Sequence, residues 1–325
     1  MILERHRPVT VALALLGLAW PAACGGPSSE ASARTADAEG GDSMPAHDTP
    51  VELAPDTRVI LVTGSTGGLG REVARRLAAG GAHVIVHGRD RERGASLVRE
   101  IEASGVGSAR FYPADFAALD NVRALAEAVR RDYDRLDVLV NNAGILVSPD
   151  RRPLSEDGHE LHFQVNYLAG FLLTRLLLPL LEESAPARIV NVSSLSVAPL
   201  DFDDLMLEDG YSTGRAYGQS KLAQVMFTID LARRLDGTGV TVNAVHPATF
   251  MDTDMVREFG MRPRTSVDEG ADAVMRLIDA DDVGSGEHYD GLSRSRAHAQ
   301  AYDPDARARL WAASEELTGL GGGGG

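Results

Sequence analysis

A strand buried on both faces and followed at once by glycines is the feature that most constrains this chain. Residues 58–63 read RVILVT, a continuous apolar run of the kind found in parallel strands that helices cover on both sides. Residues 63–70 then read TGSTGGLG, and apolar residues with helical spacing follow at 71–79. A strand, a glycine-rich turn and a helix in this order predict the first unit of a parallel α/β sheet.

The same alternation continues along the chain. Five further strands and five further helices are expected, at the short intervals typical of strand–helix–strand units. The strands are expected at 82–87, 110–113, 136–140, 188–192 and 240–245, and the helices at 91–103, 119–132, 160–181, 214–235 and 267–280. Together they predict one α/β domain over residues 56–318, a single Rossmann-type doubly wound parallel sheet with helices on both faces.

Composition narrows the class of protein. Hydrophobic residues make up 44% of the chain and charged residues 24%, which is ordinary for a soluble globular protein. The net charge of −15 makes nucleic acid a poor partner, because phosphates require Lys and Arg. The one cysteine, Cys24, excludes an intrachain disulfide and a cysteine-based zinc site. No metal is expected, since His87, His159 and His162 show no pattern of carboxylate partners.

The two ends of the chain are expected to lie outside the domain. Residues 1–24 resemble a lipoprotein signal peptide, with a basic start, a short apolar run and small residues before Cys24, so a lipid anchor at the cell envelope is predicted. The alternative is a cytoplasmic protein whose translation starts at Met44. Residues 25–55 predict a flexible low-complexity linker, and residues 319–325 a disordered, glycine-rich tail.

The glycine-rich turn has the features of a phosphate-binding loop. Gly64 permits the sharp turn, Gly68 lets the backbone approach a pyrophosphate, and Gly70 lets helix and strand pack closely. The unpaired N–H groups at the start of the helix suit an anion. The residues expected to bind a dinucleotide here are Gly64, Ser65, Thr66, Gly68, Leu69 and Gly70. A plain glycine-rich turn is the alternative.

The end of the second strand bears on which dinucleotide is bound. An NAD-selective site places a carboxylate there to bind the ribose 2′-hydroxyl. This chain has Gly88 and then Arg89, whose guanidinium suits a 2′-phosphate. NADP(H) is therefore preferred. NAD(H) stays open, since Arg89 could pair with Asp90 and Asp90 could bind a ribose.

Tyr217 and Lys221 form a pair at the start of a predicted helix. Positions i and i+4 share a helix face, so the phenol and the ammonium project the same way. A nearby cation lowers the pKa of a phenol, which suits the pair to moving a proton on or off an alcohol oxygen. Lys221 is also the single lysine among 32 basic residues, so the alternative of a chance pairing with a surface tyrosine is weak.

These motifs together resemble the short-chain dehydrogenase/reductase family, and within it the retinol-dehydrogenase-like branch. They occur in the family's order: TGSTGGLG at 63–70, NNAG at 141–144, VSS at 192–194, YGQSK at 217–221 and HPA at 246–248. The likeness to the branch rests on residues 157–181 and 215–235. Members of the family are often dimeric or tetrameric, so a homodimer or homotetramer through the Tyr217 helix and those after it is expected.

The resemblance implies a role for each matching residue. Tyr217 would be the general acid/base, Lys221 would bind the nicotinamide ribose and lower the Tyr217 pKa, and Ser194 would hydrogen-bond the reacting oxygen. Asn166 would hold a water that links Lys221 to solvent. The other implied cofactor contacts are Asp115 at the adenine, Asn141, Ala143 and Gly144 along the cofactor channel, and Pro247 and Thr249 beside the nicotinamide.

Some of these positions keep a structural alternative. Ser193 could be the reactive serine in place of Ser194, Asn166 could only kink its helix, and Asp115 could cap the helix that follows. His246, at a strand end, is expected to be structural.

The sequence also departs from the family pattern near Pro247. Ala248 replaces the usual glycine, and the threonine expected a few residues later is displaced to Thr253, which puts its cofactor contact in doubt. Met251, Met255 and Met261 fall in the expected substrate lid, as apolar packing or as substrate contacts.

Two hypotheses for function follow. The preferred one is an NADP(H)-dependent oxidoreductase that transfers hydride between nicotinamide and a small-molecule alcohol, aldehyde or ketone. The second is a non-catalytic dinucleotide-binding sensor or scaffold at the cell envelope. The intact Tyr217, Lys221 and Ser194 argue against the second, because a binding-only protein needs no proton donor.

Overall fold

The computed structural model describes residues 51–147 and 151–321. The predicted signal peptide 1–24, with Cys24, the linker up to residue 50, with Met44, and residues 322–325 of the predicted tail lie outside the described residues. Packing begins before residue 56, because Val51 and Leu53 lie half-buried against the core. It continues to Leu320, which also packs against the core and donates its amide to the Glu315 carbonyl (2.8 Å).

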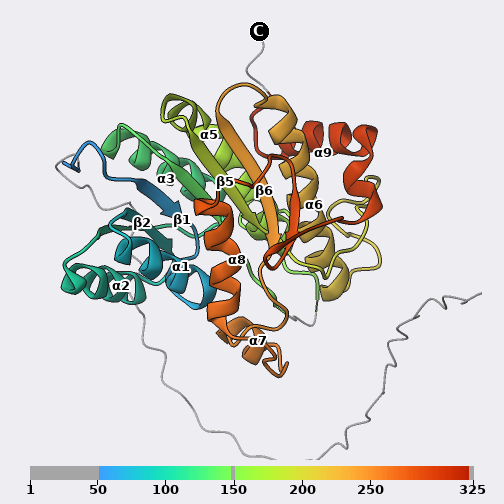
Figure 1. Ribbon diagram of the computed structural model, residues 1–325. Helices are drawn as coiled ribbons and strands as arrows, with labels where there is room; N and C mark the ends of the chain where they lie inside the picture. The colour runs from blue at the N-terminus through green and yellow to red at the C-terminus, as the bar shows by residue number, and fades with distance from the viewer. Residues whose placement is uncertain (1–50, 148–150, 322–325) are drawn as a thin grey trace, which may run out of the picture. The chain divides into compact units, whose positions relative to one another are not determined.

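Eight strands form one sheet in the order β3-β2-β1-β4-β5-β6-β7-β8 (Figure 1). The six predicted strands are confirmed with ends shifted by at most two residues: β1 Val59–Val62, β2 His83–Gly88, β3 Ser108–Pro113, β4 Val138–Asn141, β5 Ala187–Val192 and β6 Val240–His246. The sequence did not predict β7 His288–Asp290 and β8 Ser293–Ser295. Neighbours from β3 to β7 pair in parallel, but β8 pairs antiparallel with β7, so the sheet is mostly rather than wholly parallel.

The helices cover both faces of the sheet. One face carries α1 Gly68–Ala79, α2 Arg91–Ser104 and α8 Val267–Asp279. The other carries α3 Leu119–Asp132, α4 Leu161–Phe163, the π-helical turn η1 Gln164–Leu168, α5 Ala169–Glu183, α6 Thr213–Arg234, the short 3-10 helix η2 Ala299–Tyr302 and α9 Pro304–Leu317. Alternate residues of β1 enter the two apolar clusters, which explains its continuous apolar sequence.

The predicted single helix over 160–181 is interrupted. Its second turn is the π-helical η1, with Asn166 at the centre, and the helix ends at Glu183. The stretch Leu161–Glu183 is long and apolar enough to cross a membrane, but 67% of its most apolar window is buried inside the fold. It therefore packs as a core helix against the sheet.

The C-terminal helix α9, which the sequence did not predict, covers α5 and α6 (Figure 1). The Trp311 ring lies edge-on to Phe171 at 5.3 Å and tilted against Phe227 at 6.0 Å, and the Arg234 guanidinium lies 3.7 Å from the Trp311 ring centroid. The homodimer or homotetramer through α6 stays a prediction, and it would have to use surface that α9 leaves open.

Candidate active site

The loop between β1 and α1 is shaped by close backbone contacts. Gly64 has a φ of +63°, and a Cβ there would lie 2.8 Å from the Ala143 Cα. A Cβ on Gly70 would lie 2.5 Å from the Gly64 carbonyl oxygen and would also overlap the Asn142 amide nitrogen. Gly68 is exposed and has a φ of +50°. Only glycine fits these places, so the turn stays tight and the amino end of α1 stays open to a ligand.

His87 joins this loop to β2 and β3. Its Nδ1 accepts from the Gly64 amide (3.1 Å), which leaves Nε2 to donate to the Ala114 carbonyl (3.2 Å). Burial lowers the pKa of His87 to about 4, so the ring is neutral at neutral pH. The Ser65 hydroxyl accepts a hydrogen bond from the His87 amide (3.0 Å), so the Ser65 side chain also holds the loop against β2. This role of His87 was not predicted, because it depends on three separate segments of the chain.

The last residue of β2, Gly88, leaves no room for an acidic side chain. A Cβ on Gly88 would lie 2.5 Å from the Thr66 Cγ2. The next side chain, Arg89, is 69% exposed and does not pair with Asp90. Asp90 instead caps α2 by accepting from the Arg93 amide (2.9 Å), so the alternative role of Asp90 at a ribose competes with this cap.

Asp115 follows β3 and binds two groups. Its Oδ1 accepts from the Ala117 amide (2.9 Å), and its Oδ2 lies 3.5 Å from the Arg89 guanidinium. The suggestion that Asp115 caps α3 is wrong, because the N-cap is Ala118 and the Leu119 amide donates to Asp157 (2.9 Å). The predicted adenine-binding residue therefore stands beside the predicted 2′-phosphate residue.

The residues after β4 divide into two roles. The Asn141 amide donates to Thr174 and to Asn191, both at 2.9 Å, inside the fold. Gly144 lies at the surface of this core: a Cβ there would be 3.3 Å from the Asn166 Oδ1 and 3.6 Å from the Lys221 Nζ. Asn141 thus has partners inside the fold, and its predicted cofactor contact stays a prediction. Gly144 leaves open a space that Asn166 and Lys221 border.

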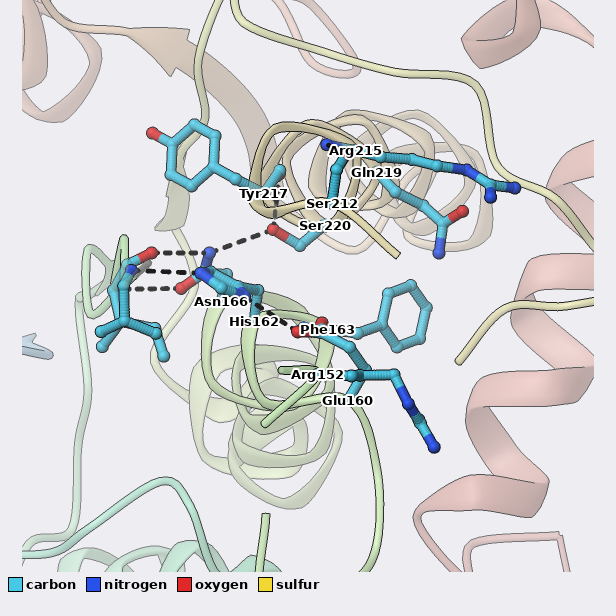
Figure 2. Close-up of polar contacts among 12 residues, drawn as sticks. Arg152, Glu160, His162, Phe163, Asn166, Ser212, Arg215, Tyr217, Gln219 and Ser220 are labelled. Carbon is cyan, nitrogen blue, oxygen red and sulfur yellow. Dashed lines mark hydrogen bonds and ion pairs between the residues drawn. The ribbon is translucent and has the colours of Figure 1, made fainter. Parts of the chain in front are cut away.

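Asn166 holds the segment after β4 against α6 (Figure 2). Its Oδ1 accepts from the Ile145 amide (2.7 Å), and its Nδ2 donates to the Ile145 carbonyl (3.1 Å) and to the Ser220 hydroxyl (3.0 Å). The π-helical turn brings the side chain to this position. These hydrogen bonds give Asn166 a structural role. The water that Asn166 is predicted to hold between Lys221 and solvent stays a prediction.

A buried hydrogen-bonded pair, His162 and Glu160, supports the same segment. The His162 Nδ1 lies 2.8 Å from the Glu160 Oε1, and both side chains are almost fully buried (Figure 2). The His162 Nε2 accepts from the Val147 amide (3.2 Å), and the Glu160 Oε2 accepts from the Phe163 amide (2.7 Å). The pairing of His162 with Glu160 was not predicted, because no metal-type pattern of carboxylates surrounds His162 in the sequence. Among residues 51–147 and 151–321, no three His, Cys, Asp or Glu side chains gather closely enough to hold a metal ion.

Three of the predicted catalytic side chains meet at the end of β5 and the start of α6. The Ser194 hydroxyl is close enough to the Tyr217 phenol to lower the Tyr217 pKa, and the Lys221 Nζ lies 5.8 Å from the Tyr217 ring centroid. The Tyr217 phenol projects away from Arg215 and Gln219 (Figure 2).

The choice between the two serines after β5 is decided by contact. The Ser193 hydroxyl is buried and donates to the Lys221 carbonyl (2.9 Å). Ser193 therefore helps to hold α6, and Ser194 is the serine that meets Tyr217.

Burial governs the protonation of Tyr217 and Lys221. It raises the pKa of Tyr217, and the hydrogen bond from Ser194 offsets this only in part. It lowers the pKa of Lys221 to about 7. Burial thus acts on Tyr217 in the opposite sense to the lowering predicted from Lys221. The Lys221 ammonium itself donates to the Val192 carbonyl and to the Gln224 side chain, each at 2.9 Å.

The end of β6 carries the residues expected beside the nicotinamide. Pro247 is buried and Thr249 is exposed. The His246 Nε2 lies 3.0 Å from the Thr249 hydroxyl, and burial lowers the pKa of His246. His246 thus fixes the Thr249 side chain, in keeping with the structural role expected for it.

The segment after Thr249 reaches the glycine-rich loop. Thr253 caps α7 Asp254–Glu258, and its Cγ2 would lie 3.2 Å from a Cβ on Gly68. The Asp254 carboxylate meets the Arg93 guanidinium at 3.2 Å. Met251 packs against the core and contacts Gly270, so this methionine is apolar packing. The displaced threonine therefore still lies against the predicted phosphate loop.

The structure brings two groups of predicted site residues together. Ser194, Tyr217, Lys221, Asn166 and Gly144 lie around one point, and Arg89 and Asp115 pair with each other. Leu69 points into the apolar core, so only its backbone is available to a ligand.

Comparison with known proteins gives a consistent result. Residues 58–263 match the profile of the family described as short chain dehydrogenase. Human retinol dehydrogenase 13 is 37% identical over 286 residues, which cover 81% of this chain and 85% of that protein.

Solved structures agree in fold. A short-chain dehydrogenase from Pseudomonas syringae has a TM-score of 0.61 at 30% identity, over 72% of this chain and 94% of that one. A short-chain dehydrogenase from Burkholderia cenocepacia, solved in complex with NADP, has a TM-score of 0.58 at 30% identity, over 72% of this chain and 95% of that one.

Proposed function

Because this chain belongs to the short-chain dehydrogenase family, in its retinol-dehydrogenase-like branch, and is an NAD(P)-dependent oxidoreductase of CH–OH groups, we propose that it uses NADP(H) on an apolar alcohol, aldehyde or ketone. Tyr217 is the general acid/base in this proposal. The observation that carries it is the meeting of Ser194, Tyr217 and Lys221 at one point.

The residues around the glycine-rich loop fit a dinucleotide. The absence of side chains at Gly64, Gly68 and Gly70 lets the backbone approach a pyrophosphate, and the amino end of α1 offers N–H donors to it. When bound, the nicotinamide supplies a hydride in reduction and accepts one in oxidation.

The side chains of the site handle the oxygen of the substrate. In reduction, the Ser194 and Tyr217 hydroxyls donate hydrogen bonds to the carbonyl oxygen, and Tyr217 then gives that oxygen its proton. In oxidation, the Tyr217 phenolate accepts the proton of the alcohol. The charged Lys221 stabilises the phenolate, which is needed because burial alone raises the Tyr217 pKa.

The surroundings of Arg89 support NADP(H) over NAD(H). A Cβ at Gly88 would overlap Thr66, Asp90 caps α2, and Arg89 presents an exposed guanidinium that pairs with Asp115 at 3.5 Å. A guanidinium in this place suits a 2′-phosphate. The similar enzyme from Burkholderia cenocepacia was solved with NADP.

Kinetics with a panel of apolar aldehydes, ketones and alcohols test the reaction, with retinol included because the relatives are named for it. The purified protein should oxidise NADPH with at least one carbonyl compound. Tyr217→Phe should abolish turnover and leave NADPH binding intact, while Ser193→Ala, which lies outside the reacting group, should keep turnover. Undiminished activity in Tyr217→Phe would refute the assignment, and NADPH binding without turnover on any compound would favour the sensor hypothesis.

A second experiment tests the cofactor. Arg89→Ala should weaken NADPH binding by about 10-fold to 100-fold, the worth of a hydrogen bond to a charged group, and leave NADH binding unchanged. Arg99→Ala, an exposed arginine further along α2, is the control. Equal losses for NADPH and NADH would contradict a 2′-phosphate contact.

A further inference from the structure

Gln224 is a buried polar residue beside Lys221 for which no role was predicted from the sequence. It lies one helical turn after Lys221 on α6, with 4% of its surface exposed. Its Oε1 accepts a hydrogen bond from the Lys221 Nζ at 2.9 Å. Gln224 is therefore placed to influence the charge and the position of the Lys221 ammonium.

The other groups around the ammonium give it little stabilisation. Lys221 is 5% exposed, and its second partner is the neutral Val192 carbonyl at 2.9 Å. From α6 the Tyr217 ring faces it at 5.8 Å, and from β6 His246 is close enough for the Lys221 charge to help lower the His246 pKa. On the side of η1 the neighbour is the neutral Asn166.

No carboxylate pairs with this ammonium in the part of the chain that the structure describes. A buried charge is stable only when hydrogen bonds replace its lost water. The Val192 carbonyl oxygen and the Gln224 amide oxygen therefore stabilise the charged ammonium. A substitution can remove only the Gln224 oxygen, because the Val192 oxygen belongs to the backbone.

Gln224 is itself held in place. The Thr228 hydroxyl donates to the Gln224 carbonyl (2.8 Å), and the Asn191 amide of β5 donates to the Thr228 hydroxyl (2.8 Å). Asn191 in turn accepts from Asn141 at the end of β4 (2.9 Å). This series of buried hydrogen bonds ties the turn of α6 that carries Gln224 to the centre of the sheet.

We propose that Gln224 is a positioning residue for the reaction: its amide oxygen, together with the Val192 carbonyl, keeps the Lys221 ammonium charged and fixed beside Tyr217. The inference rests on the proposed function, in which a charged Lys221 supports the proton transfer of Tyr217. Gln224 acts only through Lys221 and has no contact with the substrate in this scheme.

The single lysine allows a direct test. Protein made with 13C-labelled lysine shows only the Lys221 side chain, so its Cε resonance reports the protonation of this one ammonium as pH is changed. In the unsubstituted protein it should titrate near the pKa of about 7 that burial produces. Gln224→Leu keeps the size but removes the acceptor, and should move the titration about one pH unit lower. Gln224→Glu places a carboxylate there and should move it higher.

Gln219→Leu is the matched control. Gln219 is a buried glutamine on the same helix, but its side chain bonds the Asp201 amide and the Leu205 carbonyl rather than Lys221, so this variant should leave the titration in place. Should Gln224→Leu fail to fold, Gln224→Asn withdraws the acceptor by one methylene and gives the same test. Identical titrations in the unsubstituted, Leu and Glu proteins overturn the proposal, and so does a shift in Gln219→Leu as large as that in Gln224→Leu.

Turnover gives an independent readout. With the titration one pH unit lower, the charged fraction of Lys221 at pH 7 falls about fivefold, so Gln224→Leu should turn over about fivefold more slowly, and Gln224→Glu should restore the rate. An unchanged rate in Gln224→Leu counts against the proposal. The Lys221 titration is measured without substrate, so it stands or fails separately from the Tyr217→Phe test of the reaction.

Discussion

Replacing Gly70 by alanine tests the packing on which the phosphate loop depends. The new methyl group would lie 2.5 Å from the Gly64 carbonyl oxygen and would displace the Asn142 amide. That amide donates to the Thr63 carbonyl (2.8 Å) and to the Gly64 carbonyl (3.2 Å), and each lost hydrogen bond costs about 1 kcal/mol. Overpacking costs about 1–3 kcal/mol more, and the better helix propensity of alanine offsets about 1 kcal/mol. A net loss of about 2–4 kcal/mol is expected.

Urea unfolding measures the free energy of unfolding, and NADPH fluorescence measures binding to the same variant. Because the loop must open to admit the methyl group, NADPH binding should weaken as well. Gly214→Ala is the control, since a Cβ at this helical position meets nothing within 4 Å. It should be neutral or slightly stabilising. A Gly70→Ala protein as stable as Gly214→Ala, with unchanged NADPH affinity, would refute the account of this loop.

Three further outcomes are expected. Trp311→Ala should lower the free energy of unfolding in urea by about 3–5 kcal/mol, because its largely buried ring joins α9 to α5 and α6, and a loss under 1 kcal/mol would contradict that role. His162→Asn should leave the Val147 amide without its acceptor and raise the KM of the carbonyl substrate about tenfold with NADPH affinity unchanged, whereas equal changes in both would point to general unfolding. The pKa of His87 is 6.5 in the unfolded chain and about 4 in the folded protein, so the unfolded chain binds a proton more readily between these values. The free energy of unfolding should therefore fall by about 3 kcal/mol as pH drops from 6.5 to 4. Urea titrations at several pH values should show a smaller fall for His87→Gln, and an equal fall would exclude His87 as the cause.

The bridge between α7 and the glycine-rich loop has a consequence for catalysis. Thr253 lies against Gly68, and Asp254 pairs with Arg93 at the start of α2. The segment that follows Thr249 therefore contacts the predicted cofactor site. Binding at the loop and order in this segment are expected to be coupled through these two contacts.

Local pattern was enough to predict the elements that build the sheet. A strand such as β1, buried on both faces, leaves a continuous apolar run, and the helices beside it leave an apolar stripe. The strands β7 and β8 have three residues each, too few to show a period. The π-helical turn at Asn166 was also hidden, because a single extra residue in a turn does not alter the apolar pattern enough to be seen.

The sequence by itself determined the order of strands and helices, the glycine-rich turn, and the spacing of Tyr217 and Lys221, because each depends on residues that are neighbours in the chain. Only the tertiary structure decided which serine meets Tyr217, what surrounds Lys221, and where His162 and His87 find their partners. Burial and hydrogen bonding at these side chains come from segments distant in the chain, and burial sets their pKa values.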